Sequence, residues 1–193
     1  MTSTTMATQP SPAFTLEEYL DLERAANYRS EFCAGVIYPM AGDTEVHSRL
    51  AMRIGVLMTV KLQDRCRVYG SDLNVYLEKQ DLCVYPDAMV ICGEPQFWRR
   101  RKDVIVNPTL IVEVLSPSTE AYDKSIKSTY YRGLASLQYC ILAAQDRVFI
   151  EHSTRQANGD WTVRQHEERG SVLELGGLGI SIAAEEIYRS ILI

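Results

Sequence analysis

The chain has 193 residues, of which 46% are hydrophobic and 23% are charged. A chain of this length and composition can bury a substantial core in one domain, and the composition excludes general disorder. Its formal net charge of −5 argues against broad, charge-driven nucleic-acid binding, so any phosphate-binding surface must be a local basic patch.

The sequence predicts a flexible tail at 1–13 followed by a single domain at 14–193. The first twelve residues are rich in Ser, Thr and Pro and lack the apolar core of a signal peptide. No apolar run approaches the roughly 18 residues that a membrane span requires. The five cysteines are scattered without a C-x-x-C pair, which argues against a disulfide framework or zinc site and for the reducing cytoplasm.

The first elements expected along the chain are a helix, a hairpin and a second helix. Thr15 and Glu18 have capping-box spacing and begin a helix that ends near residue 26. Residues 28–32 and 35–38 predict a short hairpin. Apolar residues then recur at helical spacing and predict a long amphipathic helix over 45–64. A strand region follows at 67–77, with Gly70 as a bulge.

The next elements include two apolar runs, each interrupted once by an acid. Residues 82–92 contain Asp87, and residues 109–116 contain Glu113. A helix is expected from 119 or 122 to 134, a buried strand over 138–143, a hairpin of 147–152 with 161–166, and a last helix over 183–190. From residue 45 the order is helix, three strands, helix, strand, which predicts an α/β fold with a mixed sheet.

The two interrupting acids predict a metal site. A carboxylate in a buried strand costs several kcal/mol unless it is paired or binds a cation. If the two strands are neighbours, Asp87 and Glu113 lie at the same depth, and the peptide carbonyl of Val114 supplies a third oxygen ligand suited to Mg²⁺. The following helix carries Lys124 and Lys127. Such a set can support metal-dependent cleavage of phosphodiesters.

These residues also resemble a known family. Pro86-Asp87 followed by Glu113-Val114-Leu115 resembles the restriction-endonuclease-like PD-(D/E)XK superfamily, and 111–119 with its flanking residues is similar to a bacterial endonuclease family expanded in cyanobacteria. The resemblance implies an α-β-β-β-α-β core, with an added N-terminal helix and hairpin and a C-terminal hairpin. It also implies a cytoplasmic endonuclease that uses Mg²⁺ or Mn²⁺ to hydrolyse DNA.

The lysine of the general motif is missing, since Leu115 stands where the superfamily has lysine. In the closer family a lysine of the following helix takes that role, and Lys127 is the matching position, with Lys124 as the fallback or a solvent-facing residue. The resemblance implies Glu31 as an additional metal or supporting acid. His47 is a further candidate, either touching a phosphate or orienting a carboxylate, or else a surface histidine.

A basic cluster lies between the two acidic strands. We expect it to contact phosphates near the metal, although a solvated loop without a partner explains the cluster equally well. Its residues are Arg99, Arg100, Arg101 and Lys102.

Two functional readings follow from the sequence. The first is an endonuclease, which the acids and Lys127 favour, and cutting both strands of DNA would need two active sites, most simply in a homodimer. The second is a catalytically inactive nuclease-fold module with a nucleic-acid-binding or regulatory role. The acidic net charge and Leu115 favour the second reading.

Overall fold

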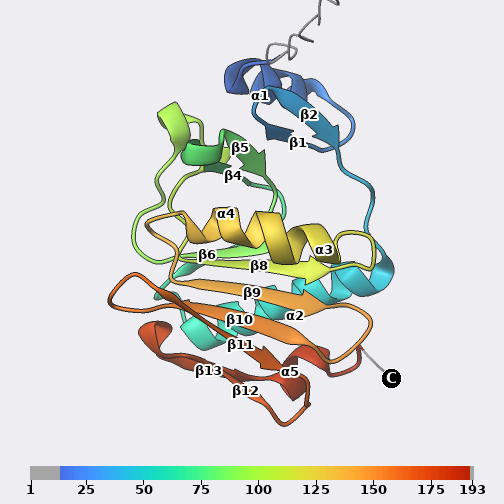
Figure 1. The fold of residues 1–193 in the computed structure, drawn as a ribbon, viewed down its shortest axis with the longest axis vertical. Helices are drawn as coiled ribbons and strands as arrows, with labels where there is room; N and C mark the ends of the chain where they lie inside the picture. Colours follow the sequence, from blue (N-terminus) through green and yellow to red (C-terminus); the bar gives the residue numbers. More distant parts are fainter. Residues whose placement is uncertain (1–13, 192–193) are drawn as a thin grey trace, which may run out of the picture.

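The computed structural model describes residues 14–191, so the tail expected at 1–13 lies outside the described residues. Its main layer is a six-stranded mixed sheet, with helix α2 on one face and the segment α3–α4 on the other (Figure 1). The strand order is β11-β10-β9-β8-β6-β3. The bounds are β3 Arg67–Gly70, β6 Ala88–Ile91, β8 Leu110–Leu115, β9 Tyr139–Ala144, β10 Ile150–Arg155 and β11 Trp161–His166.

Strand β8 lies at the centre of this sheet. It pairs antiparallel with β6 and parallel with β9, as expected for a strand that continues through a crossover helix. Val112 and Val114 pack on the side of α2 (Glu45–Leu62), whereas Ile111 and Leu115 pack on the opposite side with Tyr131. Strand alternation therefore directs Glu113 toward the α3–α4 face.

The predicted α-β-β-β-α-β core is confirmed as α2, β3, β6, β8, the α3–α4 segment and β9. The crossover segment contains α3 (Glu120–Tyr122), a π-helical turn η3 (Asp123–Lys127) and α4 (Ser128–Arg132). Single π turns inside helices are frequent at functional sites because they redirect side chains. This turn carries Lys127 at its end.

A second sheet of five strands has the order β2-β1-β5-β4-β7 and lies with α1 at the top of Figure 1. Thr15 and Glu18 form the predicted capping box at the start of α1. The predicted N-terminal hairpin is present as β1–β2. The bounds are α1 Leu16–Ala25, β1 Ser30–Cys33, β2 Val36–Pro39, β4 Asn74–Leu77, β5 Leu82–Val84 and β7 Val104–Ile105, with 3₁₀ turns η1 Glu78–Gln80 and η2 Trp98–Arg100.

Two expected strands are each divided between the sheets. The region 67–77 forms β3 and β4, so Gly70 ends a strand instead of forming a bulge. The region 82–92 forms β5 and β6, with the break at Tyr85, Pro86 and Asp87. Pro86 lacks a backbone donor and restricts the preceding residue, which explains why the ladder is interrupted there. Asp87 consequently lies just before β6 and not inside a strand.

The C-terminal part contains the predicted hairpin β10–β11 and one more hairpin that the sequence analysis did not predict. This second hairpin pairs β12 (Val172–Leu175) with β13 (Ile180–Ala183) across the turn η4 (Gly176–Leu178). Helix α5 (Ala184–Tyr188) follows and packs with α2 in the core. None of the helices within 14–191 combines the length and apolar character needed to span a membrane.

The cysteine pattern led to one wrong expectation. Cys66 and Cys92 form a disulfide, contrary to the argument against disulfides. Cys66 precedes β3 and Cys92 follows β6, whose register pairs Arg67 with Ile91. The antiparallel pairing thus places the two cysteines opposite each other, and their spacing in the sequence could not show this.

Candidate functional site

An acidic cleft lies at the carboxyl end of β8, where the two sheets and the α3–α4 segment meet. Its volume is about 390 Å³. The side chains that line it include five carboxylates but one lysine and one histidine, an excess of negative charge that suits a cation. These residues are Glu31, Asp43, Asp87, Glu113, Asp123, Lys127 and His47.

Asp87 is held at the end of β8 by the backbone of Val114. Its Oδ2 accepts a hydrogen bond from the Val114 amide at 2.7 Å and lies 3.4 Å from Nε2 of His47. The same Nε2 lies 3.0 Å from the carbonyl oxygen of Val114. The carbonyl expected to be a metal ligand is therefore already in contact with an imidazole.

His47 reaches this position from the first turn of α2. Thr44 caps the helix by accepting a hydrogen bond from the His47 amide, and the imidazole is buried with 6% of the residue exposed. Burial lowers the pKa of His47, but the hydrogen bond and charge of Asp87, together with Asp43, outweigh it and raise that pKa above its ordinary value. The alternative of a surface histidine is therefore wrong.

Glu113 lies on the α3–α4 face and is buried, although its side chain lines the cleft. Its Oε1 accepts a hydrogen bond from the Tyr131 hydroxyl at 2.5 Å and lies 3.0 Å from Nζ of Lys127. Burial raises the pKa of Glu113 to about 8, with Lys127 acting against this and Asp87 reinforcing it. The negative charge of Asp87 is thus close enough to raise the pKa of Glu113.

Lys127 connects Glu113 to the N-terminal hairpin. Its Nζ also lies 3.0 Å from Oε1 of Glu31 on β1. Burial lowers the pKa of Lys127, but Glu113, Glu31 and Asp123 together raise it above its ordinary value, so the ammonium stays charged. The structure therefore brings Glu31, Glu113 and Lys127 together.

Lys124 lies outside the residues that line the cleft. Its Nζ pairs with Glu120 at 2.7 Å and sits 3.9 Å from the centre of the Phe149 ring. Lys124 and Lys127 lie three residues apart in the π-helical turn η3, and their ammonium groups have different partners. The geometry therefore selects Lys127 as the lysine of this cleft.

The basic cluster at 99–102 packs beside α1 and does not line the cleft, although we expected it near the metal. Arg99 pairs with Glu17, and Arg101 pairs with Asp21 at 2.9 Å and with Asp103 at 3.3 Å. Part of its charge is thus neutralised by neighbouring acids. Its role in phosphate binding stays a prediction.

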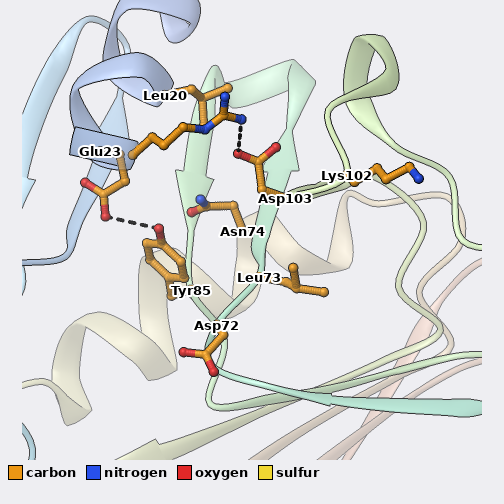
Figure 2. Close-up of a pocket in the computed structure, with 9 residues that line it drawn as sticks. Leu20, Glu23, Asp72, Leu73, Asn74, Tyr85, Lys102 and Asp103 are labelled. Atoms are coloured by element: carbon orange, nitrogen blue, oxygen red, sulfur yellow. Dashed lines mark hydrogen bonds and ion pairs between the residues drawn. The ribbon is translucent and has the colours of Figure 1, made fainter. Parts of the chain in front are cut away.

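Lys102 lines a separate cavity of about 470 Å³, shown in Figure 2. The Tyr85 hydroxyl there donates to Glu23 at 3.0 Å, while the Lys102 side chain points away from both residues. Tyr85 lines this cavity and the acidic cleft alike. Of the basic cluster, Lys102 therefore shares a cavity with Tyr85, but none of residues 99–102 lines the acidic cleft itself.

The sequence analysis did not identify Asp43. It precedes Thr44, the N-cap of α2, and its Oδ1 lies 3.7 Å from Nδ1 of His47. The sequence offered one signal for Asp43, namely an acid four residues before a histidine at the start of a helix. Only the packing of α2 against β8 brings Asp43 and His47 close to Asp87.

Comparisons with known proteins agree with this fold. A family model for Uma2, described as "Putative restriction endonuclease", matches residues 16–185. Two proteins of Synechocystis sp. are similar to this chain. "Uncharacterized protein sll1609" is 33% identical over 83% of this chain and 91% of its own length. "Uncharacterized protein slr1290" is 34% identical over 94% of this chain and 95% of its own length. A crystal structure of "a putative nuclease belonging to DUF820" from Anabaena variabilis has a TM-score of 0.73 at 16% identity, covering 93% of this chain and 99% of that one, which shows a shared fold.

Proposed function

This chain belongs to the Uma2 family of restriction-endonuclease-like proteins, and from that premise we propose that it is a metal-dependent endonuclease that hydrolyses phosphodiester bonds of DNA. The observation that carries the proposal is the position of Asp87, Glu113 and Lys127 in one cleft with an excess of carboxylates. These are the groups that such a reaction needs: hard oxygen ligands for the ion and a fixed cation for the phosphate.

The donor set of the cleft fits a divalent ion. Asp87 and Glu113 would hold Mg²⁺ or Mn²⁺, both of which accept carboxylate oxygens. A bound ion of this kind supplies positive charge beside the phosphate and makes water a better nucleophile. The Val114 carbonyl can contribute only if its contact with His47 is released or shared.

The protein residues contribute positioning and charge. Lys127 is buried, positively charged and fixed by two carboxylates, so it is ready to stabilise negative charge that develops on a phosphate without reorganising. Tyr131 orients Glu113 through its hydroxyl. Glu31 also contacts the Lys127 ammonium, which makes it a positioning residue.

The second candidate function is a non-catalytic module that binds nucleic acid or regulates a partner. The pairing of Arg99 with Glu17 and of Arg101 with Asp21 favours it, because these contacts reduce the positive potential available to DNA. The net charge of −5 acts in the same direction.

A cleavage assay separates the two functions. Supercoiled plasmid and single-stranded DNA are incubated with the wild type and with Asp87→Asn, in Mg²⁺, in Mn²⁺ and in EDTA. We expect metal-dependent cleavage that Asp87→Asn reduces at least about a hundredfold, the order of loss seen when a group that stabilises the transition state is removed. The matched control is Asp64→Asn, since Asp64 is exposed and its positive φ of 62° suits asparagine.

Two outcomes would contradict the proposal. Equal cleavage by the wild type and Asp87→Asn would mean that the activity does not arise in this cleft. No cleavage of either DNA in any metal, by a protein that still binds DNA, would support the non-catalytic module.

We also propose a homodimer, because cutting both strands of a duplex requires two active sites. Sedimentation at micromolar concentration should show a species of twice the monomer mass of 21.8 kDa. A monomer at all concentrations would instead limit the enzyme to nicking or to single strands.

A further inference from the structure

One side of the cleft contains a set of metal-ligating atoms that includes an imidazole. We propose that Asp43, His47 and Asp87 form a cation site that binds Mn²⁺ in preference to Mg²⁺ in the DNA-free protein. One candidate ligand atom from each residue lies within 4.8 Å of the other two. The inference rests on the proposed function in that Asp87 also serves the cleavage site, but it names ligands that the endonuclease motif does not include.

The imidazole of His47 is held as metal-binding histidines usually are. Such histidines donate one ring N–H to a carbonyl or carboxylate, which leaves the other nitrogen free for the ion. Here Nε2 lies 3.0 Å from the Val114 carbonyl, and Nδ1 faces Oδ1 of Asp43 at 3.7 Å, beyond hydrogen-bond distance. The ring is therefore fixed on one side and open toward a carboxylate on the other.

The site is reachable from solvent on one side and rigid on the other. The side chain of Asp43 is 56% exposed, whereas those of His47 and Asp87 are 8% and 14% exposed. Asp87 is further fixed by the Val114 amide. An ion can thus enter past Asp43 and meet two ligands that need little rearrangement.

Charge also favours this site over the neighbouring pair of Asp87 with Glu113. Once the imidazole has released its proton to the solvent, which binding of a metal ion to nitrogen requires, the two carboxylates and the neutral ring carry a charge of −2 that matches a divalent ion. Glu113 already contacts the Lys127 ammonium and the Tyr131 hydroxyl, so a cation there must compete with a fixed positive charge. In the DNA-free protein the ion is therefore expected beside His47.

The ligand types determine which ion binds. Carboxylates suit both Mg²⁺ and Mn²⁺, but a nitrogen ligand favours the transition metal, which also has the higher affinity for mixed nitrogen and oxygen sites. A site built from Asp87 and Glu113 alone would offer only oxygen and would give less discrimination. Selectivity for Mn²⁺ is therefore a signature of His47.

The test measures Mn²⁺ binding without DNA, by electron paramagnetic resonance of the free ion after treatment with EDTA and its removal. The wild type should bind one Mn²⁺ per chain, and a tenfold excess of Mg²⁺ should displace little of it. Asp43→Asn and His47→Gln should each weaken binding at least about tenfold, in line with the loss of a ligand or its support. Asp64→Asn, which removes one exposed carboxylate elsewhere, should bind as the wild type does.

Glu113→Gln distinguishes this inference from the endonuclease proposal. We expect it to keep Mn²⁺ binding in the DNA-free protein. If Glu113→Gln abolishes binding while Asp43→Asn and His47→Gln leave it intact, the ion lies between Asp87 and Glu113, and the inference fails while the endonuclease proposal stands. No Mn²⁺ binding by the wild type would also overturn it. Circular dichroism checks the fold of each variant, and the exposed position of Asp43 keeps the test valid if His47→Gln unfolds.

Discussion

Replacing Lys127 with methionine should destabilise the protein strongly, and more at pH 9 than at pH 6.5. Methionine keeps most of the side-chain volume but removes the ammonium that lies 3.0 Å from both Glu31 and Glu113. Breaking a buried charge pair by removing one partner costs about 3–5 kcal/mol, because the remaining charge is left uncompensated. We expect the lower end, about 3 kcal/mol at pH 6.5, since Glu113 can hold a proton there.

The pH dependence follows from the pKa of Glu113. Burial raises this pKa to about 8 in the wild type, and loss of Lys127 raises it further. Above pH 8 the folded wild type releases the proton, whereas the variant retains it and loses stability relative to its unfolded state. One pH unit in this interval corresponds to about 1.4 kcal/mol, so the difference should reach about 4 kcal/mol at pH 9.

Urea unfolding in EDTA, followed by circular dichroism, measures the effect. With a slope of roughly 3 kcal/mol per molar urea, the midpoint should fall by about 1 M at pH 6.5. The matched control is Lys124→Met, three residues earlier, whose partly exposed pair with Glu120 should contribute about 1 kcal/mol or less. If the two variants unfold within about 0.5 kcal/mol of each other at both pH values, the reasoning about an uncompensated buried charge is refuted.

Three further predictions concern the same cleft and the basic cluster. In EDTA, the stability of the wild type should fall as pH rises from about 4.5 to about 8, because folded Glu113 keeps a proton that the unfolded chain has released. Urea titrations at several pH values measure this slope, and Glu113→Gln should flatten it. An unchanged slope in the variant would exclude Glu113 as its source. Tyr131→Phe should lower the free energy of unfolding by about 1–3 kcal/mol through the lost hydrogen bond to a buried carboxyl, measured by the same unfolding assay, and a neutral effect would contradict the contact. Changing Arg99, Arg100 and Arg101 to alanine should weaken DNA binding about equally for all sequences and reduce its salt dependence in fluorescence titrations; wild-type binding would place the DNA path elsewhere.

Local sequence signals were sufficient for the elements whose partners are near in the chain. The capping box of Thr15 and Glu18, the apolar period of α2 and the short connection over 156–160 between β10 and β11 depend on neighbours a few residues away. The continuous apolar run around Glu113 likewise indicated a central buried strand, and β8 is buried along its whole length. The element order then limited the fold to a small set of topologies.

Signals that depend on distant contacts were missed or misplaced. Periodicity cannot show that a strand leaves one sheet for another, so the sequence predicts a bulge where the chain divides at Gly70 and a single run over residues 82–92. The disulfide between Cys66 and Cys92 follows from the pairing of β3 with β6. The alternation of apolar residues shows which face of a strand is buried, but it does not show which other strand lies beside it.

The candidate site divides in the same way. Asp87, Glu113 and Lys127 could be selected from the sequence because acids within apolar strands and a lysine on the next helix are unusual in themselves. Asp43 could not, because an exposed acid before a helix cap is ordinary until α2 packs against β8. The choice of Lys127 over Lys124 also needed the structure, because the sequence pattern did not predict the π-helical turn that contains both lysines. In this turn the Lys127 ammonium lies in the cleft, whereas that of Lys124 pairs with Glu120. Residue chemistry thus named the reacting groups, while packing between distant segments decided which of them meet.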